Sequence, residues 1–350
     1  MIRKYSYMNT IRPRITEEEN EWLQKFRDKN KGLSDECEAV GIDVKNVKHY
    51  WYKGKHYSIN ANTGKEDGYD IIRNSLIAEI KQRAPKYPKI KYTNTKEGHL
   101  LLISPADVHI GKLCTAFETN EDYNSQIAVK RVMDGVNGIL NKVRGFEIDK
   151  IVLVIGNDIL HVDTPKNTTT SFTHQDTDVM WYTAFLMAKK LYVQIIELLM
   201  QVAPVHVMYN PSNHDYAHGF LLADTISSWF SKSENISFDV SINHRKYYSY
   251  GKNLIGSTHG DGAKNTDLPL LMAHEAAENW SNSVHRYIYT HHIHHKQSKD
   301  YMSVCVEALR SPSGTDSWHH RNGYQHSPKA VEGFLHHKEY GQVARINHLF

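Results

Sequence analysis

From about residue 99 onward, short apolar runs alternate with longer segments in which apolar residues recur every three to four positions. The clearest run is 151–155, where five apolar residues, mostly β-branched, precede Gly156. Such runs are typical of strands that are covered on both faces, and the periodic segments are typical of amphipathic helices. The alternation predicts an α/β domain with a largely buried sheet.

The apolar runs and the periodic segments predict the order of elements in this domain. The predicted strands are 99–104, 151–155, 205–209, 238–240, 246–250, 253–257, 286–289, 304–308 and 342–347. The predicted helices are 124–144, 178–201, 220–230 and 268–280. Neither internal repeats nor low-complexity tracts interrupt this order, so we expect a single α/β domain over 99–350.

The N-terminal part has a different pattern, which predicts a small helical domain over 1–60 and a linker over 61–98. Three glutamates after Thr16 are typical of a helix start. The pattern predicts helices over 16–30, 34–40 and 44–52, and a turn at Gly41 makes the last two similar to a helix-turn-helix. Glycines and prolines in 61–98 favour the linker.

The outward face of the predicted third helix would suit nucleic acid. It would carry Lys45, Lys48, His49 and Lys53. Such side chains contact phosphates and enter a groove in helix-turn-helix proteins. The alternative is a helical bundle that serves packing or oligomerisation, with its lysines merely solvated.

Charge and composition indicate the kind of partner and the cellular location to expect. Residues 1–96 contain 20 Lys and Arg against 13 Asp and Glu, a net of +7, whereas the whole chain is +3 and residues 97–350 therefore carry −4. A basic N-terminal part favours an anionic partner, and cations would offset the acidic remainder. We expect no membrane span, no signal peptide and a reducing cytoplasmic location, because no long apolar run occurs and the three cysteines lack metal spacing.

Five predicted strands end in residues that bind metal ions in other proteins. These residues are Asp107 and His109, then Asp158, then Asn213 and His214, then His259, and finally His292 and His294. Carboxylate, amide and imidazole groups suit manganese, iron or zinc, and the absence of thiolates argues against a closed structural zinc site. A histidine after one strand is usually a turn or core residue, but five strand ends in series indicate a metal site. Because a carboxylate can bridge two ions, the set favours a two-metal site for phosphoryl displacement.

The order D-x-H, G-x-D, N-H-D, H, H-x-H resembles the calcineurin-like metallophosphoesterase superfamily over roughly residues 99–300. The resemblance implies a four-layer αββα sandwich with two divalent metal ions, manganese first and iron, zinc or magnesium as alternatives. By position, the first metal would be held by Asp107, His109, Asp158 and His294. The second would be held by Asp158, Asn213, His259 and His292.

The same resemblance implies catalytic roles. Water activated between the metals would attack phosphorus, and His214 would assist the leaving group, with Asp215 orienting the His214 ring. One residue departs from the family pattern: Asn157 separates Gly156 from Asp158. We expect a bulge to accommodate it.

The residues after Asp158 indicate the branch of the superfamily. The Asp-Arg pair of the protein phosphatases is absent, and His161 follows Asp158 at three residues, which resembles the SbcD-like DNA repair nucleases. The short stretch after His294 leaves little room for their additional domains. The chain therefore looks more like stand-alone phage-type enzymes, which act in the host cytoplasm.

We accordingly expect a DNA exonuclease or endonuclease, with Trp318 stacking on a base. The hydroxyl groups of the loop 164–177 could bond phosphate, although ordinary capping explains them as well. Two other functions stay open: a phosphodiesterase on a small or cyclic nucleotide, and a DNA-binding protein with an inactive phosphoesterase body.

Overall fold

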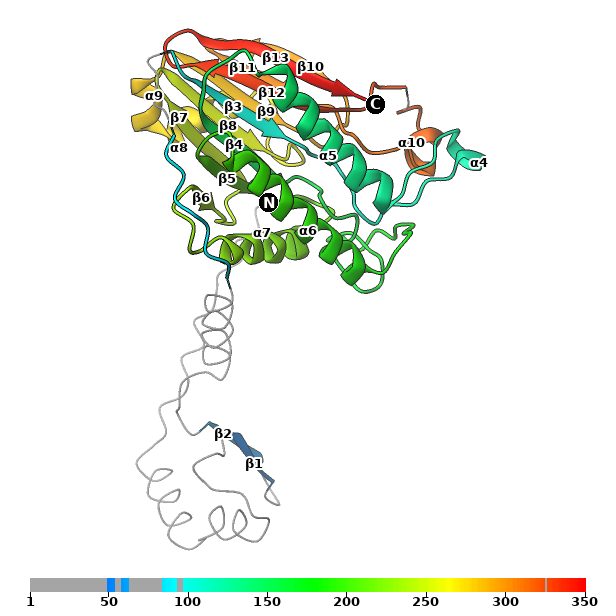
Figure 1. The fold of residues 1–350 in the computed structure, drawn as a ribbon. Coiled ribbons are helices and arrows are strands. Elements are labelled where there is room, and N and C mark those ends of the chain that lie inside the picture. Colours follow the sequence, from blue (N-terminus) through cyan, green and yellow to red (C-terminus); the bar gives the residue numbers. More distant parts are fainter. Residues whose placement is uncertain (1–48, 54–57, 63–83, 93–96, 325) are drawn as a thin grey trace, which may run out of the picture. The chain divides into compact units, whose positions relative to one another are not determined.

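A computed structural model describes residues 49–53, 58–62, 84–92, 97–324 and 326–350. The chain divides into two compact units, Met1–Leu76 and Ile77–Phe350. In the first unit, the strands β1 (His49–Lys53) and β2 (Ser58–Asn62) pair antiparallel (Figure 1). The domain limits at residues 60 and 98 remain predictions.

The predicted helix over 44–52 is wrong in its described part, because His49–Lys53 is the strand β1. The aromatic run Tyr50-Trp51-Tyr52 explains the difference, since aromatic residues favour a paired, pleated backbone over a helix. His49 and Lys53 therefore lie on a hairpin strand and not on a recognition helix. Lys45, Lys48 and the predicted helices over 16–30 and 34–40 lie outside the described residues.

The second unit contains two sheets. The first sheet has the order β13 (Gly341–Leu349), β12 (Ala330–His337), β3 (His99–Ser104), β4 (Ile148–Gly156), β5 (Val205–Asn210) and β6 (Ile236–Asp239). The second has the order β10 (Gln297–Tyr301), β11 (Val304–Ala308), β9 (His285–Thr290), β8 (Asn253–Thr258) and β7 (Arg245–Tyr250). Strands β3 to β6 run parallel, as do β8, β9 and β11, so their carboxyl ends share one edge of each sheet.

Helices cover the outer face of each sheet (Figure 1). These are α5 (Ser125–Lys142), α6 (Trp181–Met200) and α7 (Tyr216–Trp229) on the first sheet, and α8 (Leu268–Glu275) and α9 (Ala277–Asn282) on the second. The short helices α4 (Ala116–Thr119) and α10 (Ser317–Arg321) lie beside each other, away from the sheet faces (Figure 1). One core cluster joins the first sheet to α5, α6 and α7, and another joins the second sheet to α8.

The two sheets pack face to face. Alternate residues of β3 and β4, such as Leu100 and Val152, point into a third cluster with Ile255 and Tyr289 of the second sheet. Their neighbours Leu101 and Ile151 point to the helical side. Alternation with apolar residues on both faces places β3 and β4 between two layers. The described unit is thus an αββα sandwich, as the resemblance implied.

Most predicted elements of this unit are confirmed within a few residues. The strands divide between two sheets, as an αββα sandwich requires. The predicted helix over 268–280 is two helices, and β10 and β12 were not predicted. Strand β12 carries Glu332, Gly333, His336 and His337, and all of its residues are buried. Its buried polar side chains hide the apolar pattern of a strand.

The segment 84–92, which the sequence assigns to the linker, lies against the second unit. Tyr87 donates a hydrogen bond to Glu197 on α6 at 2.7 Å, and Tyr92 donates to the carbonyl of Met200 at 2.7 Å. This stretch therefore belongs structurally to the body of the second unit. Within the described parts of the chain, no helix has the length and apolar character that a membrane span requires.

Candidate metal centre

Backbone hydrogen bonds continue between β3 and β4 after both strands have ended. The amide of Asp107 donates to the carbonyl of Asn157 at 2.7 Å, and the amide of His109 donates to the carbonyl of Asp158 at 2.9 Å. Asp107, His109 and Asp158 are each at most 2% exposed. Backbone hydrogen bonds therefore hold together the two buried loops that follow β3 and β4.

Two polar contacts join the site edges of the two sheets. At the ends of β5 and β8, Asn210 Nδ2 donates to the carbonyl of Ser257 at 3.1 Å, and Ser257 Oγ donates to Asn210 Oδ1 at 2.6 Å. At the ends of β3 and β9, Ser104 Oγ and His291 Nε2 lie 3.3 Å apart. All four side chains are buried. The site lies where these edges meet, which explains how strand ends from different sheets converge.

The first group of candidate ligands contains Asp107, His109 and His294, whose ligand atoms all lie within 4.8 Å of one another. His294 Nε2 lies 3.3 Å from His109 Nε2 and 3.5 Å from Asp107 Oδ1. The amide of His292 donates to both carboxylate oxygens of Asp107 at 3.2 Å, which fixes that carboxylate.

The second group contains Asp158, His259 and His292. His259 Nε2 lies 3.2 Å from Asp158 Oδ2 and 2.9 Å from Asn213 Oδ1. The other oxygen of Asp158 accepts the amide of His214 at 3.0 Å. Asp107, His109 and His294 of the first predicted set are thus brought together, as are Asp158, Asn213, His259 and His292 of the second. Asp158 as a bridge that also serves the first set remains a prediction.

The backbone at these positions is conformationally unusual. Asp107, His109, Asp158, His292 and His294 all have φ between 50° and 71°, the left-handed region that residues with a Cβ rarely occupy. Such conformations cost about 1–3 kcal/mol each and cluster at functional sites. The fold therefore stabilises an arrangement that these residues would not adopt on their own.

Burial and neighbouring charges shift the pKa values of the candidate ligands. Burial opposes the ionisation of Asp158, but the neighbouring His259 outweighs it and lowers the pKa of Asp158 below its usual range. Burial alone would lower the pKa of His259, yet the Asp158 carboxylate raises it to about 9. Burial lowers the pKa of His109, His292 and His294. These three imidazoles are neutral at pH 7, the form that binds metal.

The atoms that the candidate ligands offer are of the kinds that bind divalent ions. It consists of carboxylate and amide oxygens and imidazole nitrogens, which suit manganese, iron or zinc. Candidate ligand atoms lie 3.3 Å or less apart in both groups, as between His109 Nε2 and His294 Nε2 and between His259 Nε2 and Asp158 Oδ2. A divalent cation between them would relieve the electrostatic cost of burying these groups.

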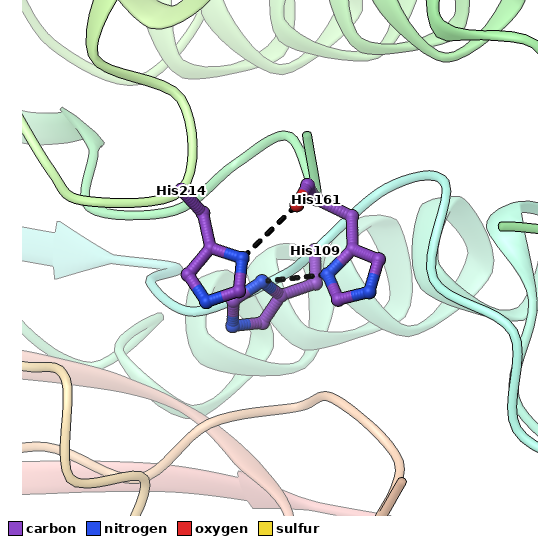
Figure 2. A group of neighbouring side chains, drawn as sticks. All are labelled: His109, His161 and His214. Atoms are coloured by element: carbon purple, nitrogen blue, oxygen red, sulfur yellow. Dashed lines mark hydrogen bonds between the residues drawn. The ribbon is translucent and has the colours of Figure 1, made fainter. Parts of the chain in front are cut away.

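Figure 2 shows His109, His161 and His214 side by side. Nδ1 of His161 lies 3.3 Å from Nδ1 of His109, on the far side of the His109 ring from the first group of ligands. If His109 binds metal through Nε2, its Nδ1–H donates to His161, which orients the ligand from behind. His161, a catalytic candidate from the sequence, would then act as a positioning residue for His109.

His214 has a defined orientation. Its Nδ1 lies 3.0 Å from the carbonyl oxygen of His161, and the two rings stack with centroids 5.3 Å apart (Figure 2). Because a carbonyl oxygen only accepts, Nδ1 of His214 carries a hydrogen. Nε2 is then the atom that can exchange a proton with a substrate.

Asp215 does not have the contact that was predicted for it. Its carboxylate accepts from Ser212 Oγ at 2.6 Å and from the amide of Leu160 at 2.9 Å, whereas the ring of His214 bonds to the His161 carbonyl. Asp215 lies at the N-cap of α7 and ties the loop after β4 to the loop after β5. Burial and the charge of Asp158 raise the pKa of Asp215 to about 7.

Asn157, the residue outside the family pattern, is part of a left-handed turn. Gly156, Asn157 and Asp158 have φ of 87°, 55° and 60°. A Cβ on Gly156 would lie 2.0 Å from the carbonyl oxygen of Asn210, so only glycine fits there. The turn, and not a ladder bulge, accommodates the extra residue. The buried side-chain amide of Asn157 has no hydrogen-bond partner among the described residues.

A buried ion pair and a stacked histidine lie next to the candidate ligands. Lys112, 1% exposed, forms an ion pair of 2.7 Å with Asp316. Asp316 also accepts from His319 Nδ1 at 2.7 Å, and the His319 ring stacks on His294 with centroids 4.9 Å apart. The segment before α10 therefore lies against the metal ligands. Lys112 belongs to no recognisable motif, so only the folded chain reveals it, whereas His319 lies in the stretch 311–320 that the sequence indicates as a candidate substrate contact.

The two predicted kinds of substrate contact differ in the structure: Trp318 is exposed, whereas the loop hydroxyls bond within their own loop. Trp318 lies on α10, 61% exposed, beside His319. In the loop after Asp158, the hydroxyl of Thr170 donates to Asp163 at 2.9 Å, and Thr164 and Thr168 share a 2.7 Å hydrogen bond. These hydroxyls serve the structure of the loop, as the capping interpretation expects.

Comparison with known proteins gives similarity of structure alone. No family model matches the sequence, and no curated protein matches it. Similar solved structures include an archaeal phosphodiesterase (9% identity, TM-score 0.34, 72% of this chain and 99% of that one). Others are a zinc complex of Vps29 from Entamoeba histolytica (12%, TM-score 0.31, 72% and 98%) and a hypothetical protein from Pyrococcus horikoshii (12%, TM-score 0.32, 71% and 87%). Since these TM-scores are low, the chemistry must be inferred from the residues of the site.

Proposed function

We propose that the protein is a metal-dependent phosphodiester hydrolase of the calcineurin-like type that acts on nucleic acid, as a DNA exonuclease or endonuclease. The observation that carries the proposal is the pair of ligand groups at one edge, Asp107/His109/His294 and Asp158/His259/His292. A structural zinc site would need one closed set of four ligands, commonly with thiolates. Two adjacent carboxylate–imidazole groups suit two ions and phosphoryl chemistry instead.

Asp107, His109, Asp158 and His294 would hold one ion, and Asp158, Asn213, His259 and His292 the other. When bound, two such ions stabilise the developing charge of a phosphodiester and lower the pKa of water towards ~7. His214 has the complementary task. With Nδ1 committed to the His161 carbonyl, its Nε2 delivers a proton to the departing oxygen.

Two features support nucleic acid as the substrate. Exposed aromatic side chains lie beside the ligand groups, with Trp318 at 61% and Tyr324 at 62% exposure. Aromatic platforms of this kind stack on bases. The excess of positive charge in residues 1–96 also favours a polyanion. The SbcD-like branch and the phage-type, cytoplasmic setting belong to the same proposal.

The test is a screen of the full-length protein with manganese, zinc, iron or magnesium. The substrates are single- and double-stranded DNA, RNA, cyclic nucleotides and bis(p-nitrophenyl) phosphate. We expect hydrolysis of the small diester and of DNA, abolished by EDTA and restored by metal. Cleavage of circular single strands would identify an endonuclease.

Hydrolysis of cyclic nucleotides alone would replace the proposal with a small-nucleotide phosphodiesterase. Absence of all hydrolysis, with retained DNA binding, would indicate an inactive phosphoesterase body.

A further inference from the structure

A pocket of about 190 Å³ borders the first ligand group and has no role in the chemistry described so far. We call it the His294 pocket, and its lining includes His294, His295, Thr315, His319, Tyr324 and Lys329. A larger hollow of about 420 Å³ lies at the other end of β4, near Ile148, away from the metal ligands. Of these two, the His294 pocket is the one that could hold a part of the substrate next to the reacting phosphate.

The chemistry of the pocket favours an anion. Its described lining contains imidazoles, hydroxyls and one ammonium group but no carboxylate. Lys329 Nζ donates to Thr315 Oγ1 at 3.2 Å, which directs the ammonium along the wall formed by Thr315. Burial lowers the pKa of Lys329, so its charge would be stabilised by a bound anion. The nearby Glu121 is already bonded to Arg131 and to the amide of Thr315.

The pocket is too small for a whole nucleotide. Pockets that enclose a drug-sized molecule measure ~300–1,000 Å³, so a volume of about 190 Å³ suits one compact group such as a phosphate. The His294–His319 ring stack and the hydrogen bond from His319 to Asp316 fix the place of the pocket next to the first ligand group. The group would therefore lie one step along a backbone from the phosphate held by the metals.

An aromatic rim lies at the mouth of this pocket. Trp318 neighbours His319, with ring centroids 5.1 Å apart, and Tyr324, with centroids 5.7 Å apart. Helix α4 lies beside α10 (Figure 1), and its Phe117 is fully exposed. Exposed aromatic residues beside a cationic pocket are the arrangement that binds unpaired nucleotides, with phosphate on the cation and base on the ring.

We infer that the His294 pocket is a subsite for the nucleotide next to the cleaved bond, which selects single-stranded nucleic acid. Its phosphate binds at Lys329, Thr315 and His319, and its base stacks on Trp318 outside the pocket. A duplex keeps its bases paired and cannot place one on Trp318. The inference rests on the proposed function, because it assumes that a phosphodiester binds at the metal centre.

Turnover measurements test the proposed function, and binding measurements test the subsite. Turnover of bis(p-nitrophenyl) phosphate by the wild-type protein tests the proposed function. Binding of a short fluorescent single strand to metal-loaded His214→Ala protein tests the subsite, because that variant retains the strand uncleaved. Lys329→Gln and Trp318→Ala are added singly to the His214→Ala background, with Lys252→Gln and Tyr340→Ala as controls. The two controls lie in the turns β7–β8 and β12–β13, at the opposite end of the sheets.

Trp318→Ala should weaken binding of the single strand ~10-fold, as expected for one lost base stack. The loss should vanish when that nucleotide is abasic. Lys329→Gln should weaken both the normal and the abasic strand, and should lower the slope of log K against log salt by ~0.7. In the otherwise wild-type protein, the control substitutions Lys252→Gln and Tyr340→Ala should change hydrolysis of the small diester by less than about twofold.

Equal losses for the control variants, or none for Trp318→Ala and Lys329→Gln, would overturn the subsite while leaving the diester activity intact. An unchanged Trp318→Ala effect on the abasic strand would also overturn base stacking. Failure of the wild-type protein to hydrolyse any diester contradicts the proposed function, whatever the binding data show.

Discussion

Asp158 Oδ2 and His259 Nε2 lie 3.2 Å apart in a site where both side chains are 1% exposed, and they come from different sheets. The carboxylate follows β4 of the first sheet and the imidazole follows β8 of the second. Without metal, the two groups neutralise each other as an ion pair. With metal, both are ligands, and the proton of His259 must leave.

This pair predicts how the stability of the metal-free protein depends on pH. The folded pKa of His259, about 9, exceeds its ordinary value of 6.5. Its stabilising contribution is therefore complete below pH 6.5 and is lost as the pH rises towards 9, at up to ~1.4 kcal/mol per pH unit. Urea unfolding in EDTA between pH 6.5 and 9 should show this decline.

His259→Gln should flatten that decline, and His274→Gln, a substitution of an exposed histidine on α8, should keep it. Metal-loaded protein should show the opposite trend, because protons compete with the metal for His259. An equal slope in His259→Gln and wild type would show that another group is responsible.

Asp158→Asn should weaken both metal sites at once. The substitution removes the one negative charge that would serve both ions, while the amide can still accept the backbone hydrogen bond from His214. We expect metal analysis after dialysis to find both ions depleted and hydrolysis reduced at least ~100-fold. Asp224→Asn removes a carboxylate from the exposed side of α7 and should keep full metal content. Loss of a single ion would rule out the bridging role.

His214→Ala should slow turnover while keeping both metals. The side chain contacts the His161 carbonyl and stacks on rings, but it is absent from both proposed ligand sets. Loss of a group that transfers a proton usually costs ~10²–10⁴ in rate. Substrates with a good leaving group, such as p-nitrophenolate, should be affected less than DNA. Metal depletion in His214→Ala would reassign the residue to the ligands.

Asn210→Ala should loosen the site from a distance. The substitution removes the buried contacts between Asn210 and Ser257, which join β5 to β8, and leaves the Ser257 groups unpaired. Leaving buried polar groups unsatisfied costs ~1–3 kcal/mol each. The urea midpoint should fall, and metal affinity should fall with it, because ligands from the two sheets lose their alignment. Asn141→Ala, an exposed position in the last turn of α5, is a suitable comparison. A lower midpoint with unchanged metal affinity would show that the contact serves the fold alone.

The sequence alone determined the order of elements in the second unit and the identity of the candidate ligands. Apolar runs such as 151–155 fix local strand structure through side-chain patterning, and the polar residue that ends each run is visible without any fold. The pattern was less informative where polar residues are buried, as in β12 with Glu332 and His336. It was wrong for His49–Lys53, where aromatic residues form a paired strand.

Only the tertiary structure decided how these residues meet. The strands divide between two sheets, and the contact of Asn210 with Ser257 aligns the two edges. Asp215 bonds to Ser212 and Leu160 and not to the His214 ring, while Lys112 reaches the site from a segment without a motif. Local patterning encodes the period of each element, but contacts between residues such as His109 and His294, separated by 185 positions, depend on how complete layers pack.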